Sequence, residues 1–152
     1  MNKNLNYKPL DDLSAHILEE LQLDARLSIT EIGRRVGLSA PAIAERIKRM
    51  EDEGIITGYR ALVDTDKIGL TVNAFITLKS NMTHAAAAKR ISEIPEVVEC
   101  YNITGNNCVI MKVSAPTTRR LEAVIGQLQL IGETNTSIIL SPTFDSRIIR
   151  RN

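Results

Sequence analysis

The sequence predicts an α+β protein in two parts: an N-terminal winged helix-turn-helix and a C-terminal ferredoxin-like βαββαβ sandwich. Three observations predict this class. Residues 10–53 place apolar residues at helical spacing, interrupted by a short turn that contains glycine. From residue 72 the period changes to the alternation that is typical of strands. The second half then follows the order β-α-β-β-α-β, which is the order of a split βαβ sheet.

Length and composition are consistent with this division. The chain has 152 residues, of which 43% are apolar, enough for one medium domain or two small ones with packed cores. Only 3% of the residues are aromatic, which argues against a platform of stacked rings for single-stranded nucleic acid. The net charge is +1, so total charge gives no support for nucleic-acid binding, and a basic surface has to be local.

The chain divides into five expected segments. These are an N-terminal arm over 1–9, the winged helix-turn-helix over 10–63, a linker over 64–71, the second domain over 72–142, and a basic C-terminal tail over 143–152. A first helix is expected from Leu10 to residues 24–26, with Asp11 or Asp12 near its N-terminus. It completes a three-helix core with the helix-turn-helix pair.

The helix-turn-helix itself is predicted over residues 28–53. Ser28 and Glu31 form a capping box for its first helix, and Gly37 ends that helix because glycine adopts the left-handed conformation at little cost. Ser39 is expected to cap the second helix, with Pro41 in its first turn. The buried stripe of this helix is formed by Ile43, Ile47 and Met50.

The opposite face of this second helix is small at its N-terminal end and basic further along. At about 100° per residue, the residues that point away from the buried stripe are Pro41, Ala42, Glu45, Lys48 and Arg49, with Arg46 on the flank. Arg34 and Arg35 extend the basic stripe. A DNA major groove admits such a surface, because nothing bulky blocks entry and donors for phosphates and bases follow. A charge run alone would equally indicate a solvated helical hairpin.

Two short extended runs in residues 55–64 meet at Gly58 and predict a small hairpin, the wing. Tyr59 and Arg60 lie beside that turn. Two interpretations of Tyr59 stay open: contact with a phosphate backbone, or packing on the preceding helix.

In the second domain we expect strands over 72–80, 97–104, 108–113 and 134–140, with helices after Thr83 and after residues 116–117. Pairing around Asn106 is expected to set Tyr101 opposite Met111 on one side of the sheet, with Cys100, Asn102 and Ile110 on the other. Both sides then keep apolar residues, and two helices can cover only one of them. We therefore expect the domain to dimerise through the uncovered face.

Nothing in the sequence indicates catalysis, a cofactor or a metal site. It has no paired-carboxylate pocket, Ser-His-Asp set or phosphate loop, and its two cysteines, Cys100 and Cys108, do not form a Cys-x-x-Cys motif. No apolar run approaches the roughly 20 residues that a bilayer span requires, and no signal-peptide pattern opens the chain. With free thiols, the expected location is the cytoplasm.

These motifs together resemble the leucine-responsive and asparagine-operon (Lrp/AsnC, feast/famine) transcriptional regulators. The similarity covers residues 10–140 and is most specific over 39–59. It implies an N-terminal domain on double-stranded DNA, a homodimer that assembles into a homo-octamer, and a second domain that binds a small-molecule effector, commonly an amino acid. It also implies a nucleoid-associated protein. The family motif places against DNA Ser39, Ala40, Pro41, Ala42, Glu45, Arg46 and Arg49, and the basic stripe and the wing add Arg34, Arg35, Lys48 and Tyr59.

The same resemblance implies an effector site. The family commonly carries Gly-Asp-x-Asp and an aromatic residue between the second and third strands, whereas this chain has glycine, two asparagines, cysteine and valine over 105–109. Asparagine can accept a hydrogen bond but carries no charge to pair with an ammonium group. The candidate effector residues are Thr104, Gly105, Asn106, Asn107, Cys108, Thr134 and Thr136. The missing acids leave two functions open: a sequence-specific regulator modulated by an amino acid or related molecule, or an architectural DNA-wrapping protein with low sequence preference and no effector.

Overall fold

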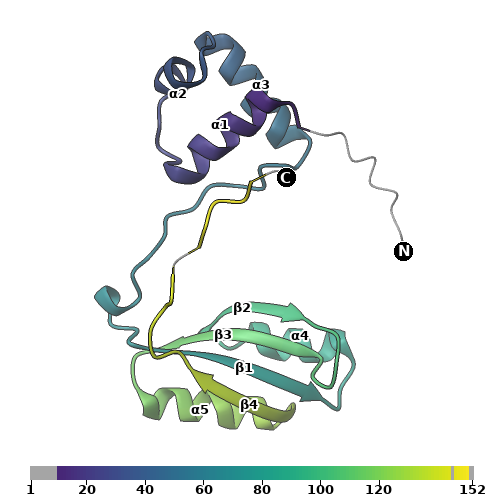
Figure 1. Cartoon of the computed structure of the whole chain (residues 1–152). Coiled ribbons are helices and arrows are strands. Elements are labelled where there is room, and N and C mark those ends of the chain that lie inside the picture. Colours follow the sequence, from purple (N-terminus) through teal and green to yellow (C-terminus); the bar gives the residue numbers. More distant parts are fainter. Residues whose placement is uncertain (1–9, 145, 151–152) are drawn as a thin grey trace. The chain divides into compact units, whose positions relative to one another are not determined.

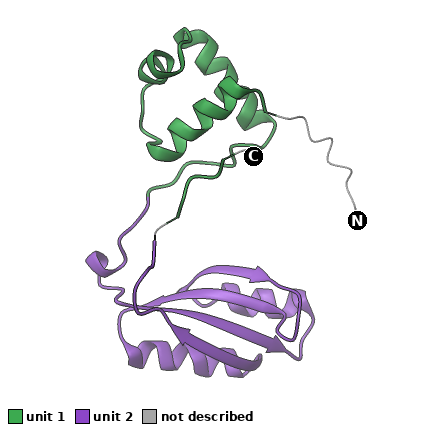
Figure 2. Ribbon diagram, in the orientation of Figure 1, with its two compact units in different colours: residues 1–61, 145–152 green, residues 62–144 purple. Residues whose placement is uncertain are grey.

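The computed structural model describes residues 10–144 and 146–150. The N-terminal arm predicted over 1–9 lies outside the described residues. The chain forms two compact units, residues 1–61 with 145–152 and residues 62–144 (Figure 2). Of the predicted C-terminal tail, residues 146–150 thus belong to the first unit and residues 143–144 to the second. Each unit is described here by itself.

The first unit is built from three helices (Figure 1): α1 over Asp12–Leu23, α2 over Ile29–Val36 and α3 over Ala40–Asp52. Their apolar faces meet in one core, whose fully buried members are Ile17, Ile32, Ile43 and Met50. Each such side chain contributes roughly 1.5–3 kcal/mol when it leaves water. The predicted stripe of α3 is therefore confirmed at residues 43 and 50, while Ile47 packs half-buried at the edge of this core.

The helix ends follow the local sequence signals, with two differences. Asp11 caps α1, Ser28 accepts from the Glu31 N–H at 3.1 Å, and Gly37 ends α2 at a φ of 79°. The Glu31 carboxylate does not complete the predicted capping box, because it binds arginine side chains instead. Ser39 occupies the N-cap of α3, but its side chain makes no capping hydrogen bond.

The prediction of a hairpin, the wing, in residues 55–64 is wrong for the residues that the structure describes. Between α3 and the first strand the described residues contain only η1, one 3₁₀ turn over Asp66–Ile68. Gly58 has a φ of 152°, far from the φ of about 60° that a tight hairpin turn needs. Most of residues 55–64 is exposed, and a two-stranded hairpin without a packed face is marginal in water.

The second unit is a four-stranded antiparallel sheet with two helices. Its strands are β1 over Val72–Ser80, β2 over Val97–Asn102, β3 over Val109–Ala115 and β4 over Gly132–Ile138, in the spatial order β2-β3-β1-β4. The helices are α4 over His84–Ser92 and α5 over Thr118–Gln129. This is the predicted ferredoxin-like arrangement, so the α+β fold class is confirmed.

Both helices of this unit pack on the same face of the sheet. One continuous core joins Ala74, Ile76 and Leu78 of β1 to Ile91 of α4 and Val124 of α5. The alternation of buried and exposed residues along β1 is the one the sequence predicted. None of the described helices of this unit packs on the opposite face, and Phe75 remains 44% exposed there.

The predicted pairing of β2 with β3 is wrong by one residue. Tyr101 lies opposite Ile110, and Cys100 lies opposite Met111. The reason is a nonlocal contact: the Cys108 N–H donates to the Leu78 carbonyl oxygen at 3.0 Å, which binds this residue to β1 and lengthens the loop. A one-residue slip moves every side chain to the other face of the sheet. Tyr101 and Ile110 therefore lie on the helix-free face, and Cys100 lies on the helix side.

Candidate nucleic-acid interface and effector region

The surface of α3 opposite the core has the predicted composition. Pro41, Glu45, Lys48 and Arg49 are exposed, and Ala42 is half-buried. The turn before α3 is closed by the Leu38 N–H, which donates to the Gly33 carbonyl oxygen at 3.0 Å, and α3 itself is held by Ile43 and Met50 in the three-helix core. The face is therefore small at its first turn, carries cations two turns later, and is fixed to a packed three-helix unit.

Two of the predicted DNA-contacting arginines bind the N-terminus of α1. Nη1 of Arg46 donates to both carboxylate oxygens of Asp11, at 2.7 and 2.8 Å, and to Oγ of Ser14 at 2.8 Å. Nη2 of Arg49 donates to Asp11 Oδ2 at 3.2 Å and to the same hydroxyl at 3.3 Å. Ser14 is fully buried and Asp11 also accepts from its N–H. Sequence reasoning identified Asp11 only as a helix cap and missed this contact.

The hydrogen bonds around Asp11 keep it ionised. The backbone N–H of Ser14 is the largest cause, and the Arg46 guanidinium adds to it, so that together they lower the pKa of Asp11 to about 2. The carboxylate is thus charged throughout the physiological range, and the pairs with both arginines persist there.

A second carboxylate holds the other two predicted arginines. Glu31 accepts from Nε and Nη2 of Arg34, at 3.0 and 2.8 Å, and from Nε of Arg35 at 2.9 Å. Arg35 also donates to Glu20 of α1 at 2.7 Å. The hydrogen bonds from Arg34 and then Arg35 lower the pKa of Glu31 to about 2. All four arginines of the basic stripe are therefore paired inside the unit.

Three polar groups on the same surface, unlike the four arginines, are not bound by a side chain that the structure describes. Lys48 and Glu45 form no ion pair with any residue that the structure describes. The Ser39 hydroxyl also makes no hydrogen bond within residues 10–144 and 146–150. None of these three groups has to leave a described protein partner before it binds a ligand.

Tyr59 makes the contact that one of the two open interpretations expected. Its hydroxyl donates to Oε1 of Glu51, on the last turn of α3, at 3.0 Å. Burial, and then this carboxylate, raise the pKa of Tyr59. Tyr59 thus contacts the third helix, and the neighbouring negative charge disfavours an approach of phosphate to the same hydroxyl.

The candidate effector residues gather at one end of the sheet of the second unit. Gly105, at a φ of 116°, opens the exposed loop that carries Asn106. Cys108 lies against β1, where its thiol donates to the Leu78 carbonyl oxygen at 3.3 Å. Thr134 is the register partner of that same Leu78. The remaining members are Thr104 and Asn107 in the loop and Thr136, which lies two residues further along β4 opposite Ile76.

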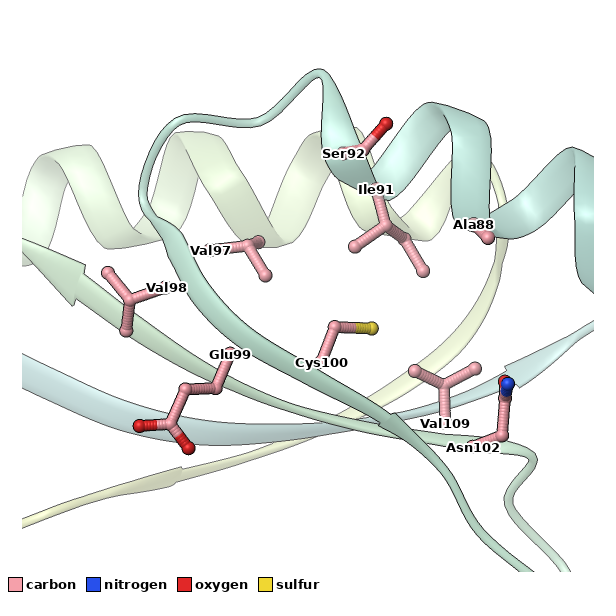
Figure 3. A pocket seen from close by; sticks show the side chains of 9 residues that line it. All are labelled: Ala88, Ile91, Ser92, Val97, Val98, Glu99, Cys100, Asn102 and Val109. Atoms are coloured by element: carbon pink, nitrogen blue, oxygen red, sulfur yellow. The ribbon is translucent and has the colours of Figure 1, made fainter. Parts of the chain in front are cut away.

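A pocket of about 430 Å³ lies between α4 and the edge strand β2. Its wall is formed by Ala88 and Ile91 of the helix and by Val97 and Cys100 of the strand, whose thiol points inward (Figure 3). Partial burial raises the pKa of the Cys100 thiol above its ordinary value. None of the predicted effector residues lines this pocket, and no sequence pattern indicated it.

The described residues contain no group of three or more His, Cys, Asp and Glu side chains that could hold a metal ion. None of the described helices has the length and apolar character that crossing a membrane requires.

Comparison with known proteins identifies both units. Residues 10–51 match the model of the AsnC-type helix-turn-helix domain, and residues 71–149 match the model of the Lrp/AsnC ligand binding domain. The chain is 35% identical to the HTH-type transcriptional regulator LrpC of Bacillus subtilis over 87% of this chain and 92% of that protein. It is 36% identical to the proline dehydrogenase transcriptional activator of Rhodobacter capsulatus over 78% of this chain and 79% of that protein.

Solved structures agree with these matches. The structure of B. subtilis LrpC has a TM-score of 0.87 and 32% identity, covering 91% of this chain and all (100%) of that one. The transcriptional regulator NMB0573 of Neisseria meningitidis, solved as a complex with L-Met, has a TM-score of 0.84 and 26% identity, covering 91% and 94%. The helix-turn-helix is followed along the chain by the four-stranded sheet, and the matches cover nearly the whole chain. The protein therefore belongs to the Lrp/AsnC family of transcriptional regulators.

Proposed function

We propose that the protein is a sequence-specific DNA-binding transcriptional regulator whose helix α3 enters the major groove. The observation that carries the proposal is the surface of α3, which is small at its first turn and cationic beyond it on a rigid helical unit. A major groove accepts a helix with this profile because the backbone can approach the bases before longer side chains reach phosphates. We infer that the chain acts as a regulator in the cytoplasm, on the nucleoid, and not as an enzyme.

Each group on this surface has a proposed role. Pro41 and Ala42 let the first turn approach the base edges closely. The Ser39 hydroxyl and Lys48 bind phosphates, since neither is engaged by a described protein partner. Arg49 reaches phosphate or guanine through the guanidinium edge that Asp11 does not occupy. The other proposed contacts are Arg34, Arg35, Ala40, Glu45, Arg46 and Tyr59. Of these, Tyr59 should contribute least, because its hydroxyl already binds Glu51.

The helix-free face of the second unit supports a dimer. Phe75 and Tyr101 are 44% and 57% exposed on it, and an apolar sheet face on a small domain usually meets a partner. A two-fold dimer would present two copies of α3 to successive major-groove faces, roughly 34 Å apart or a multiple of that. Assembly of dimers into an octamer belongs to the same proposal, and light scattering that finds a monomer at micromolar concentration would contradict both.

We further propose that an amino acid or a related small molecule binds at the loop around Asn106. The Neisseria relative, whose structure is a complex with L-Met, supports an amino-acid ligand. Since Asn106 and Asn107 are uncharged, they would hold an ammonium group through side-chain oxygens only, which weakens binding relative to a carboxylate. A thermal-shift screen against the amino acids tests this, with a clear stabilisation by one of them as the expected result.

The DNA proposal is tested by selection and substitution. Duplexes are selected from a random-sequence pool with the wild-type protein, and the enriched duplex is compared with an unrelated one of equal length. Arg49→Ala should weaken binding to the enriched duplex by about 1–3 kcal/mol. Arg119→Ala, an exposed arginine on α5, serves as the matched control and should leave affinity unchanged. An affinity ratio near one between the two duplexes would instead indicate the architectural function.

A further inference from the structure

The arginines of the candidate DNA surface are all held by acidic side chains of the same unit. Asp11 binds Arg46 and Arg49, at shortest distances of 2.7 and 3.2 Å. Glu31 binds Arg34 at 2.8 Å and Arg35 at 2.9 Å. The four arginines of the surface are thus held by internal partners, whereas Lys48 is not.

The pairs leave part of each guanidinium available. Toward the residues that the structure describes, Arg46 makes its three contacts through Nη1 alone, and Arg49 makes its two through Nη2 alone. A guanidinium carries five N–H donors over three nitrogens in a rigid plane. No described residue accepts from the other two nitrogens of either arginine, so they can donate to a further acceptor in a direction that Asp11 and the buried Ser14 hydroxyl define.

Arginines that are held and partly neutralised by carboxylates affect binding to arbitrary DNA and binding to a matched sequence differently. Binding to arbitrary DNA depends on cations that neutralise phosphates and release counterions, and it tolerates any geometry that mobile side chains can reach. A guanidinium already paired with a carboxylate contributes less net charge, and it cannot adapt its position to an ill-placed phosphate. A matched duplex, whose acceptors lie along the open donor directions, gains from the preorganisation.

We propose that Asp11 is a specificity-determining residue: by holding Arg46 and Arg49 it weakens binding to arbitrary DNA more than binding to the matched site. Glu31 acts in the same way on Arg34 and Arg35. This inference rests on the proposed function, since it concerns the preference of that same surface. The low pKa of Asp11, about 2, keeps the carboxylate charged whenever DNA is bound under ordinary conditions.

The test is the substitution Asp11→Asn. Asparagine is as good an N-cap as aspartate and retains an acceptor for the Ser14 N–H, so α1 keeps its cap while the charge is removed. The matched control is Asp52→Asn, which removes the same charge from the exposed end of α3, where Asp52 forms no ion pair with a described residue. Thermal unfolding confirms that both variants are folded.

The readout is the affinity ratio between the duplex enriched by the wild type and an unrelated duplex of equal length, measured over a range of salt. For Asp11→Asn we expect affinity for the unrelated duplex to rise about three- to fivefold. Its salt dependence should steepen by up to about one unit of slope. Affinity for the enriched duplex should change less, so the ratio falls. For Asp52→Asn the ratio should stay at the wild-type value.

The outcomes separate this inference from the proposed function. If the wild type prefers its enriched duplex and Asp11→Asn keeps or increases the ratio, Asp11 does not determine specificity. If Asp11→Asn and Asp52→Asn lower the ratio equally, the effect is one of general charge, and the role of the arginine pairs is overturned. If the wild type itself shows a ratio near one, the proposed function fails first, and the preference assigned to Asp11 fails with it.

Discussion

Gly33→Ala should destabilise the helix-turn-helix, although alanine is the better helix former. Gly33 is buried within α2, and a Cβ atom added there would lie 2.5 Å from the carbonyl oxygen of Leu38. Ordinary contact begins near 3.4 Å, so the turn would have to move away by about 0.9 Å (3.4 minus 2.5). The obstructing atom belongs to the backbone, so no side-chain rotation relieves the contact.

The expected magnitude follows from two opposing terms. Overpacking of this kind costs about 1–3 kcal/mol. We expect a cost in the upper half of that range, because moving the turn also strains the hydrogen bond from the Leu38 N–H to the Gly33 carbonyl oxygen. Alanine recovers about 1 kcal/mol of helix propensity. The net destabilisation should be about 1–2 kcal/mol, which lowers the melting temperature of a unit of this size by roughly 4–8 °C per kcal/mol.

The chain offers a matched control for this substitution. Gly126 lies within α5, and a Cβ added there meets nothing within 4 Å. Gly126→Ala should therefore stabilise the second unit by up to about 1 kcal/mol. Both variants are followed by urea unfolding with circular dichroism. A Gly33→Ala protein as stable as the wild type would refute the packing described for α2 against the turn, and with it the fixed position of α3.

Three further predictions concern other parts of the molecule. Ile76→Ala empties the centre of the second core and should cost about 2–5 kcal/mol in urea unfolding; a smaller loss would contradict that packing. Because the pKa of Asp11 is lowered in the folded state, the ionised carboxylate stabilises the fold fully above the unfolded pKa near 3.8, and this contribution is lost as pH falls toward 2. The loss should be about 1 kcal/mol after allowance for solvent screening. The free energy of unfolding of Asp11→Asn should therefore depend less on pH in this acid range than that of the wild type. Gln22 donates to and accepts from the backbone of Ile149 at 2.9 and 2.8 Å, so Gln22→Ala should speed hydrogen exchange of the Ile149 amide, and unchanged exchange would contradict the docking of the tail.

The features that were predicted correctly from the sequence depend on contacts between residues that are near one another in the chain. Ser28 and Gly37 bound α2 because a cap and a left-handed end are decided within three or four residues. The buried stripe of α3 and the alternation of β1 follow from the period alone. These signals were sufficient to predict the α+β class and the exposed face of α3.

What the sequence could not predict depends on contacts between distant residues. The register of β2 was wrong because Cys108 binds the carbonyl of Leu78, which is 30 residues away. The pair between Asp11 and Arg46 joins residues 35 apart, and nothing in a cap motif reveals it. The wing was wrong because two extended runs form a hairpin only where a turn and a packed face support them.

Base analogues in the duplex that the wild type enriches test whether α3 lies in the major groove. Replacing purine N7 by carbon, as in 7-deazaguanine or 7-deazaadenine, removes acceptors from the major groove only, whereas inosine in place of guanine removes the minor-groove amino group. Fluorescence anisotropy should show that affinity falls about fivefold or more when N7 is removed at the contacted bases. Inosine should leave affinity unchanged. Sensitivity to inosine with indifference to N7 removal would contradict the assignment of α3 to that groove.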